Sequence, residues 1–167
     1  WGFVPAYIKI KRGVSEVITT IMMNFISLAL INYLLTEFLA VKSTVRTEKI
    51  LEVASIPKLS DFAFIFQGSS ANLTFVFAIL LAVASYFIFY KTKFGFKLRA
   101  VGLNPKASKY LGINTDKMTI LAFMIGAGIT SFVGLNFVFG YKGYYEYGFS
   151  NNIGFTAIAV TLLAKNN

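Results

Sequence analysis

Two long uncharged stretches constrain this chain more than any other feature. Residues 73–90 (LTFVFAILLAVASYFIFY) and 119–141 (TILAFMIGAGITSFVGLNFVFGY) run for 18 and 23 positions without Asp, Glu, Lys or Arg. A hydrocarbon core of roughly 30 Å needs about 20 residues of helix. Inside that core every backbone polar group must be bonded within the protein. The chain is therefore predicted to be all-α, a polytopic bundle of transmembrane helices.

Composition supports a membrane protein over a water-soluble domain. Hydrophobic residues make up 56% of the chain and charged residues 14%, and the mean hydropathy is +0.67. A soluble core would break into shorter amphipathic elements. The net charge of +9 could suggest nucleic acid, but the basic residues cluster at the ends of apolar stretches, where anionic lipid headgroups attract them. We expect a lipid bilayer as partner and no nucleic acid.

The chain lacks the residue types that most site chemistry needs. It has neither Cys nor His, so it offers no thiol and lacks the commonest proton shuttle and metal ligand. No paired intramembrane acids, hydrolytic triad or phosphate loop appear. We expect no catalytic residue, no metal site and no cofactor bound directly by this chain.

The apolar stretches divide the chain into spans of about 17–41, 73–90 and 119–141, with a further segment starting at 153–164. The sequence begins at Trp1 and stops soon after that further segment starts. We read residues 1–167 as a single transmembrane domain that is incomplete at both ends.

Basic residues set the expected orientation. The segment before Gly13 has three bases and no acid, and Lys91–Lys117 has seven bases against one acid. The loop 42–72 carries four bases and three acids. Because excess Lys and Arg in short loops mark the cytoplasmic side, the N-terminal segment and the loop 91–118 are predicted to be cytoplasmic.

Several features fall on the side predicted to face outward. Residues 47–54 resemble a short amphipathic helix, and Phe62–Phe66 forms an apolar patch for the interface or for neighbouring helices. Asn72-Leu73-Thr74 matches a glycosylation sequon, which we interpret as coincidence. An interfacial aromatic belt is expected from Tyr141, Tyr144, Tyr145, Tyr147 and Phe149.

The third span carries small residues four apart on one helical face. Small side chains let a second helix approach closely in lipid. We interpret the stripe as a helix-packing surface, with a gating hinge as the alternative. Its members are Ala122, Gly126, Thr130 and Gly134.

The basic loop contains a short helix bracketed by strong local signals. Asn104 is a good N-cap, Pro105 suits the first helical position and Gly112 can end the helix. These signals predict a helix at Pro105–Leu111, and Asn114 or Thr115 starts the next one. Since so short a helix is marginal alone, it needs a surface. The local signals leave open a lipid-interface elbow and a docking element for a soluble subunit.

The first span has a dense set of polar groups. Polar residues at that depth face the bundle interior or a watery cavity. They could form a hydrogen-bonding wall along a solute path, or bond neighbouring helices together. The candidate path residues are Glu16, Thr19, Thr20, Asn24, Ser27 and Asn32.

The loop string GFKLRAVGLNPKASKYLGINTDKMTILAFMIGAGI is similar to the cytoplasmic loop of bacterial ABC importer permeases for branched-chain amino acids, simple sugars and nucleosides. The strings GVSEVITTIMMNFISLALINYLL, WGFVPAYIKIKRG and GFTAIAVTLLAKNN resemble the nucleoside branch, which is linked to basic membrane proteins. Together they cover nearly the whole chain.

The resemblance implies a set of partners. These are a second permease subunit, a cytosolic ABC ATPase that holds ATP and Mg²⁺, and an extracytoplasmic solute-binding lipoprotein. The short helix would be the coupling helix resting on the ATPase. The residues that the resemblance assigns to that contact are Gly102, Asn104, Pro105, Lys106, Ala107, Lys109, Tyr110 and Gly112.

The chain departs from the family pattern at three positions. Thr156 stands where Asp is usual, Ala164 where Gly is usual and Ser108 where Ala is usual. The loss of Asp puts a polar role at position 156 in doubt.

The leading hypothesis is a permease subunit, in the bacterial cell membrane, of an ATP-driven importer for nucleosides or related simple sugars. An ion-gradient-driven secondary transporter and a non-transporting membrane scaffold are the alternatives.

Overall fold

The computed structural model describes residues 1–41, 44–51, 54–57, 72–149 and 153–164. The predicted all-α class is confirmed: within these ranges the regular elements are helical, apart from two isolated β-bridges. The elements are α1 (Phe3–Arg12), α2 (Glu16–Leu34) and its π-helical end η1 (Leu35–Leu39), α3 (Leu73–Lys91), α4 (Lys93–Leu103), α5 (Pro105–Tyr110), α6 (Thr115–Leu135) and its π-helical end η5 (Asn136–Lys142), and α7 (Ile153–Leu163).

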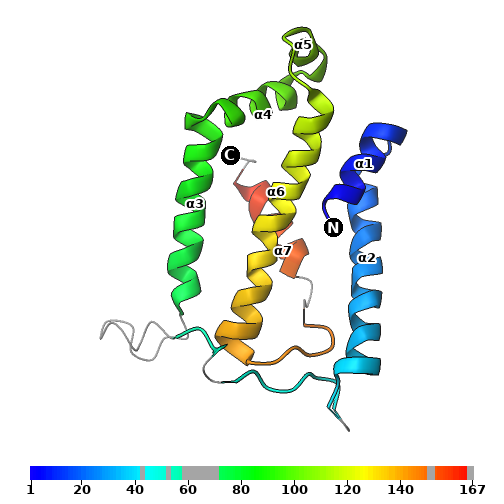
Figure 1. Ribbon diagram of the computed structural model, residues 1–167, viewed down its shortest axis with the longest axis vertical. Helices are drawn as coiled ribbons and strands as arrows, with labels where there is room; N and C mark the ends of the chain where they lie inside the picture. Colours follow the sequence, from blue (N-terminus) through cyan, green and yellow to red (C-terminus); the bar gives the residue numbers. More distant parts are fainter. Residues whose placement is uncertain (42–43, 52–53, 58–71, 150–152, 165–167) are drawn as a thin grey trace.

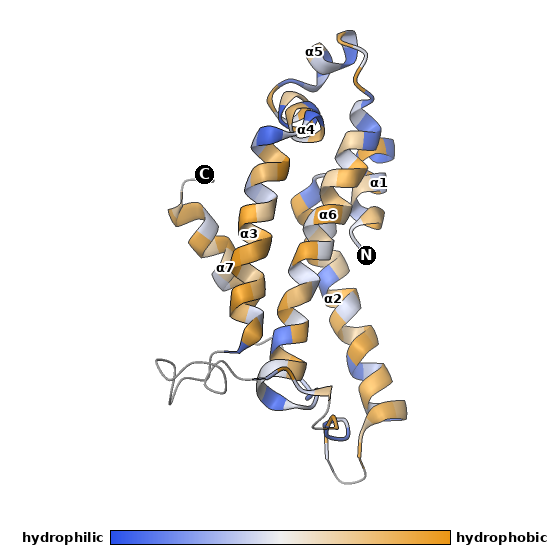
Figure 2. Cartoon of the chain, turned by 60° about the vertical axis from the view of Figure 1, so that its left-hand side comes forward, coloured by the Kyte–Doolittle hydropathy of each residue, from blue (hydrophilic) through white to orange (hydrophobic). Residues whose placement is uncertain are grey.

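Three helices are long and apolar enough to cross a membrane: Glu16–Leu39, Leu73–Lys91 and Thr115–Gly140. They overlap the three spans expected from the sequence. Their most apolar windows are almost entirely unburied within the chain, at 6%, 0% and 0%. Figure 2 shows apolar colour over most of α2, α3, α6 and α7. These faces suit lipid or further helices, because exposing them to water would be costly.

The two ends of the bundle differ in character. In Figure 1, α2, α3 and α6 run alongside one another, and α4 lies across one end between α3 and α6. The short helix α5 projects beyond that end, which we call the α5 end. The opposite end, the loop end, carries residues 40–41, 44–51, 54–57 and 143–149.

Residues 1–13, read from the sequence as a non-membrane segment, fold back on the bundle as α1. The Trp1 indole donates to the Met23 carbonyl of α2 at 3.2 Å. A Cβ on Gly2 would lie 2.6 Å from the Phe123 carbonyl oxygen of α6. The basic residues of α1 sit in its last turn, at the α5 end (Figure 1). The N-terminal segment therefore lies against α2 and α6. The basic residues of α1 lie at the same end of the bundle as the basic loop 91–118.

The helix α4 was not predicted. Thr92 caps it, because its hydroxyl oxygen accepts the Gly95 N–H at 3.1 Å while its hydroxyl donates to the Ile88 carbonyl at 2.6 Å. The Arg99 guanidinium lies 4.9 Å from the centre of the Tyr90 ring. These contacts join α3 to α4 at a fixed elbow, so the basic loop is largely helical.

The helix expected at 47–54 is wrong for residues 47–51, which form no helix. Thr47 pairs with Ala40, and Arg46 pairs with Glu146. The Thr47 N–H donates to the Tyr145 carbonyl at 2.9 Å, and the Ile50 N–H donates to the Gly143 carbonyl at 2.7 Å. Backbone partners from 143–147 and the β-branched residues of this segment favour extended chain. The patch Phe62–Phe66 lies outside the described residues.

Candidate functional site

The short helix in the basic loop is confirmed, and its caps are those predicted. The Asn104 side-chain oxygen accepts the Ala107 N–H at 3.0 Å, and Pro105 occupies the first position. Gly112 adopts φ +76°, the left-handed region that favours glycine. The Asn114 side chain then accepts the Lys117 N–H at 3.0 Å and starts α6. α5 is thus held between two capped junctions.

The α5 end presents large apolar side chains to the exterior. Tyr110 is 93% exposed and Leu103 is 88% exposed, whereas Ser108 on the inner side of α5 is 2% exposed. A Cβ on Gly102 would meet nothing within 4 Å. Exposed rings and Leu side chains among basic residues suit contact with another protein or with lipid headgroups. All eight residues implied by the resemblance are exposed there: Gly102, Asn104, Pro105, Lys106, Ala107, Lys109, Tyr110 and Gly112.

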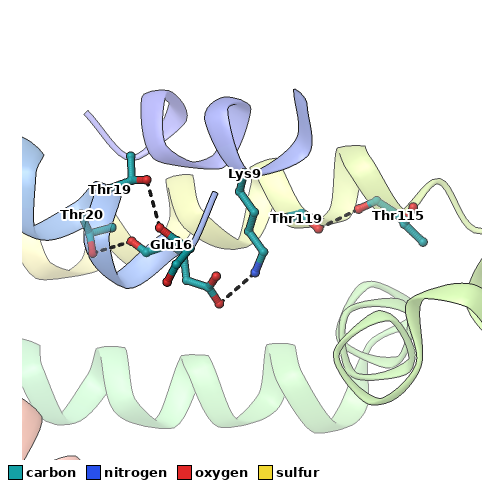
Figure 3. Close-up of polar contacts among 7 residues, drawn as sticks. Lys9, Glu16, Thr19, Thr20, Thr115 and Thr119 are labelled. Carbon is teal, nitrogen blue, oxygen red and sulfur yellow. Dashed lines mark hydrogen bonds and ion pairs between the residues drawn. The ribbon is translucent and has the colours of Figure 1, made fainter. Parts of the chain in front are cut away.

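The polar groups at the start of α2 are engaged locally. The Lys9 ammonium lies 2.9 Å from the Glu16 carboxylate, across the turn between α1 and α2 (Figure 3). The Thr19 hydroxyl donates to the Ser15 carbonyl at 3.0 Å and the Thr20 hydroxyl to the Glu16 carbonyl at 2.9 Å. A hydroxyl that donates to a carbonyl one turn back in its own helix needs no hydrogen-bond acceptor from a neighbouring helix.

Two of the candidate path residues line a common hollow. Thr20 and Asn24 face α7 across a space of about 220 Å³, with Phe155 on its far side. Thr19 is buried, and Glu16, Ser27 and Asn32 are half-buried; none of these four lines that space. The structure thus brings together only part of the polar face of α2.

The small-residue stripe of α6 borders a second hollow. Ala122, Gly126 and Thr130 line an open space of about 560 Å³ that Trp1 and Met23 also border. A Cβ on Gly126 or Gly134 would meet nothing within 4 Å. The N-terminal segment approaches α6 closely on a neighbouring face instead, where Gly2 lies against Phe123 and Ala127. A packing role for the stripe remains a prediction.

A polar cluster between α3 and α6 at the loop end was missed. The Asn72 amide nitrogen donates to the side-chain oxygen of Asn136 at 2.8 Å. Asn72 is only 5% exposed, which supports reading its sequon as coincidence. A Cβ on Gly140 would lie 2.0 Å from the Asn72 amide nitrogen, so glycine there makes room for the pair. The available signal was one Asn directly before the uncharged stretch 73–90 and another near the end of the uncharged stretch 119–141.

The chain matches, over residues 1–167, the family described as "Branched-chain amino acid transport system / permease component". It belongs to this family. The resemblance found in the sequence is thereby confirmed, and the apolar helices have the setting that they require, a membrane.

Several characterised relatives match nearly the whole of this permease-family chain. The nucleoside ABC transporter permease protein NupB of Lactococcus lactis is 32% identical, and the guanosine ABC transporter permease protein NupP of Bacillus subtilis is 38% identical. Both alignments cover 99% of this chain and 47% of the relative. The glucose ABC transporter permease protein TsgB13 of Haloferax volcanii is 26% identical over 100% of this chain and 46% of its own length. The chain spans about half the length of these relatives, and no solved structure matches it.

Proposed function

We propose that this chain is part of the permease subunit of an ATP-driven importer that carries nucleosides across a bacterial cell membrane. One observation carries the proposal: this chain, a member of a family of transport permeases, presents a capped and exposed helix, α5, beyond the ends of its apolar helices. The projection of α5 beyond the spanning helices favours a soluble subunit over a lipid-interface elbow as the partner that covers the exposed Tyr110 and Leu103. A soluble subunit would bury both.

The contact with the ATPase forms at the α5 end, which faces the cytoplasm. ATP and Mg²⁺ are held by the ATPase subunit, and this chain supplies the surface that ATPase closure moves. Because α4 is fixed to α3 at Thr92 and α6 starts directly after Gly112, a displacement of α5 tilts both spanning helices. Lys106 and Lys109 add positive charge beside the contact, which steers the encounter with an acidic rim.

The proposed solute class is supported by the relatives at 32% and 38% identity, whose names specify nucleosides and guanosine. The relative named for glucose is more distant, at 26%, and simple sugars are the second solute class. A second permease subunit completes the transmembrane path, and an extracytoplasmic lipoprotein delivers the solute at the loop end.

Arginine at the tip of α5 tests the coupling contact. In the full-length permease expressed with its ATPase, we expect Gly102→Arg and Tyr110→Arg each to reduce ATPase co-purification at least tenfold. A charged side chain placed in a buried apolar contact costs several kcal/mol, so ATP-dependent uptake of tritiated guanosine should fall in parallel.

The matched control is Tyr147→Arg, the same substitution at a 57% exposed tyrosine of the loop end. It should leave ATPase co-purification at the wild-type level. Wild-type uptake by the α5 variants would reject the coupling assignment. Uptake that survives ATP depletion but stops with the ion gradient would indicate a secondary transporter, and absence of any solute-dependent thermal shift would favour a scaffold.

A further inference from the structure

The elbow between α3 and α4 carries positive charge that the chain does not neutralise. Residues 62–115 contain no Asp or Glu. Four bases lie within nine positions at this elbow, and all four are exposed: Lys91, Lys93, Lys97 and Arg99. The ion pairs in the described part of the chain join Lys9 to Glu16 and Lys142 to Glu146, so none of them involves these four bases. Since like charges this close repel one another, the elbow is suited to an anion from outside the chain.

The α3–α4 elbow stands at the edge of the apolar part of the molecule. Lys91 is the last residue of α3, whose most apolar window is 0% buried, and α4 lies across that end of the bundle (Figure 1). Tyr86 and Tyr90 are exposed near the end of α3, with ring centres 4.9 Å apart. Tyrosine rings at the end of a spanning helix settle at headgroup depth. The elbow is therefore level with the lipid headgroups.

Arg99 is held against this pair of tyrosines. Its guanidinium lies 4.9 Å from the centre of the Tyr90 ring, a distance at which an aromatic face attracts a cation. No described residue accepts a hydrogen bond from the Arg99 side chain, which is exposed. A guanidinium matches the oxygens of a phosphate with two parallel N–H donors. Arg99 is thus placed to receive a phosphate beside the lipid-exposed surface of α3.

The exposed face of α4 has the pattern of an interfacial helix. Lys93, Phe96 and Arg99 are three positions apart, so they share one face, and Phe96 is 62% exposed. A ring on such a face can enter the acyl region while the long basic side chains beside it reach the phosphates. An acidic soluble protein would match the charge but would not reach the tyrosines of α3, which stand at the membrane. These observations favour lipid as the occupant.

We propose that the α3–α4 elbow binds an anionic phospholipid of the leaflet at the α5 end. Arg99 and Lys93 hold the phosphate, and the acyl chains lie along α3 beside Tyr86 and Tyr90. A zwitterionic lipid offers the same phosphate, but its ammonium group would meet the lysines of the elbow, so phosphatidylglycerol is preferred over phosphatidylcholine. The bases at this end of the bundle then serve two partners, because α5 projects beyond the headgroups toward the ATPase. The lipid site requires a chain embedded in a membrane, and it does not depend on which solute is carried.

Lipid titration of charge variants tests the site. The full-length permease, purified with its ATPase in a neutral detergent, is titrated with phosphatidylglycerol or with phosphatidylcholine of the same acyl chains. Native mass spectrometry measures the fraction of complex that holds each lipid. Arg99→Gln and Lys93→Gln should each weaken phosphatidylglycerol binding about three- to fivefold, the scale of one base near an anionic surface, and leave phosphatidylcholine binding unchanged. The matched control Lys109→Gln removes a base of α5 and should bind both lipids as wild type does.

Thermal unfolding provides a readout without mass spectrometry. Phosphatidylglycerol should raise the melting temperature of the wild-type complex more than phosphatidylcholine does. That difference should shrink in Arg99→Gln and in Lys93→Gln, and should vanish for the wild type in about 1 M salt, where the screening length is about 3 Å.

Four results would overturn the site. Equal binding of the two lipids by the wild type would remove the preference for an anion, and a loss in Lys109→Gln as large as that in Arg99→Gln would indicate diffuse attraction. Displacement of the lipid by an equal concentration of glycerol 3-phosphate would assign the elbow to soluble anions. Lipid bound only after removal of the ATPase would assign it to the ATPase.

Discussion

Gly95 determines how closely α4 can leave the end of α3. A Cβ at this position would lie 2.2 Å from the Phe89 carbonyl oxygen and 2.3 Å from that of Ile88. Both neighbours are backbone atoms, so a side chain at position 95 can be accommodated only by opening the elbow. Since the elbow leads through α4 to α5, the absence of a side chain at position 95 helps to set the position of α5.

Gly95→Ala should therefore destabilise the permease by about 1–3 kcal/mol, the usual cost of overpacking, and should lower ATP-dependent uptake. The control is Gly128→Ala in α6, where a Cβ meets nothing within 4 Å. That change should be neutral or stabilising by up to about 1 kcal/mol, because alanine favours helix. The melting temperatures of the two purified variants provide the comparison. Equal melting temperatures would show that the elbow is not tightly packed.

The residues whose structural role could be predicted from the sequence are those that act on residues close to them in the chain. Asn104, Pro105 and Gly112 act on backbone groups within four positions, so their spacing alone defines α5. Asn72 and Asn136 are 64 positions apart, and their hydrogen bond exists only because α3 and α6 meet at the loop end. No local pattern could have paired them.

The same distinction holds for whole elements. The spanning helices follow from length and hydropathy, because lipid permits few alternatives. The stretch Lys93–Leu103 has two glycines and three bases and reads as loop, yet the Thr92 cap and the packing of Gly95 make it helical. Residues 47–51 fail as a helix for the opposite reason, since a distant strand-like segment supplies their hydrogen bonds.

The hydrogen-bonded pairing of residues 44–51 with residues 143–147 at the loop end should depend on pH through Tyr145. Burial raises the pKa of the Tyr145 phenol above its ordinary value. Its ring packs against Phe149 with centres 4.9 Å apart. The folded state therefore resists ionisation more than the unfolded state does. Its contribution to stability is complete below about pH 10, the unfolded pKa, and is lost as pH rises through the higher folded value.

Hydrogen exchange of residues 44–51 in the full-length permease, followed from about pH 8 to 11, measures this effect after correction for the intrinsic rate. In the wild type, residues 44–51 should lose protection from exchange near the upper end of this pH range. Tyr145→Phe should abolish the part of that loss that comes from ionisation of the Tyr145 phenol. The control Tyr147→Phe alters a more exposed ring and should behave as wild type. An unchanged alkaline loss in Tyr145→Phe would assign the effect to another group.

The exposed apolar faces indicate how the whole molecule is arranged. Within the described residues the buried hydrophobic core consists of Ala6, Leu35 and Val101, so the helices are held by their ends and by a few crossings. The remaining apolar faces suit lipid or further helices.

The orientation and occupancy of the α5 end can be measured directly, since the chain contains no Cys. Tyr110→Cys and Tyr147→Cys, each as the sole cysteine of the full-length permease, are exposed to a membrane-impermeant maleimide. The account predicts that Cys at 147 reacts in intact cells. Cys at 110 should react only in inverted vesicles stripped of the ATPase and should be protected when the ATPase is restored. Labelling at position 110 from outside intact cells, or no protection by the ATPase, would contradict it.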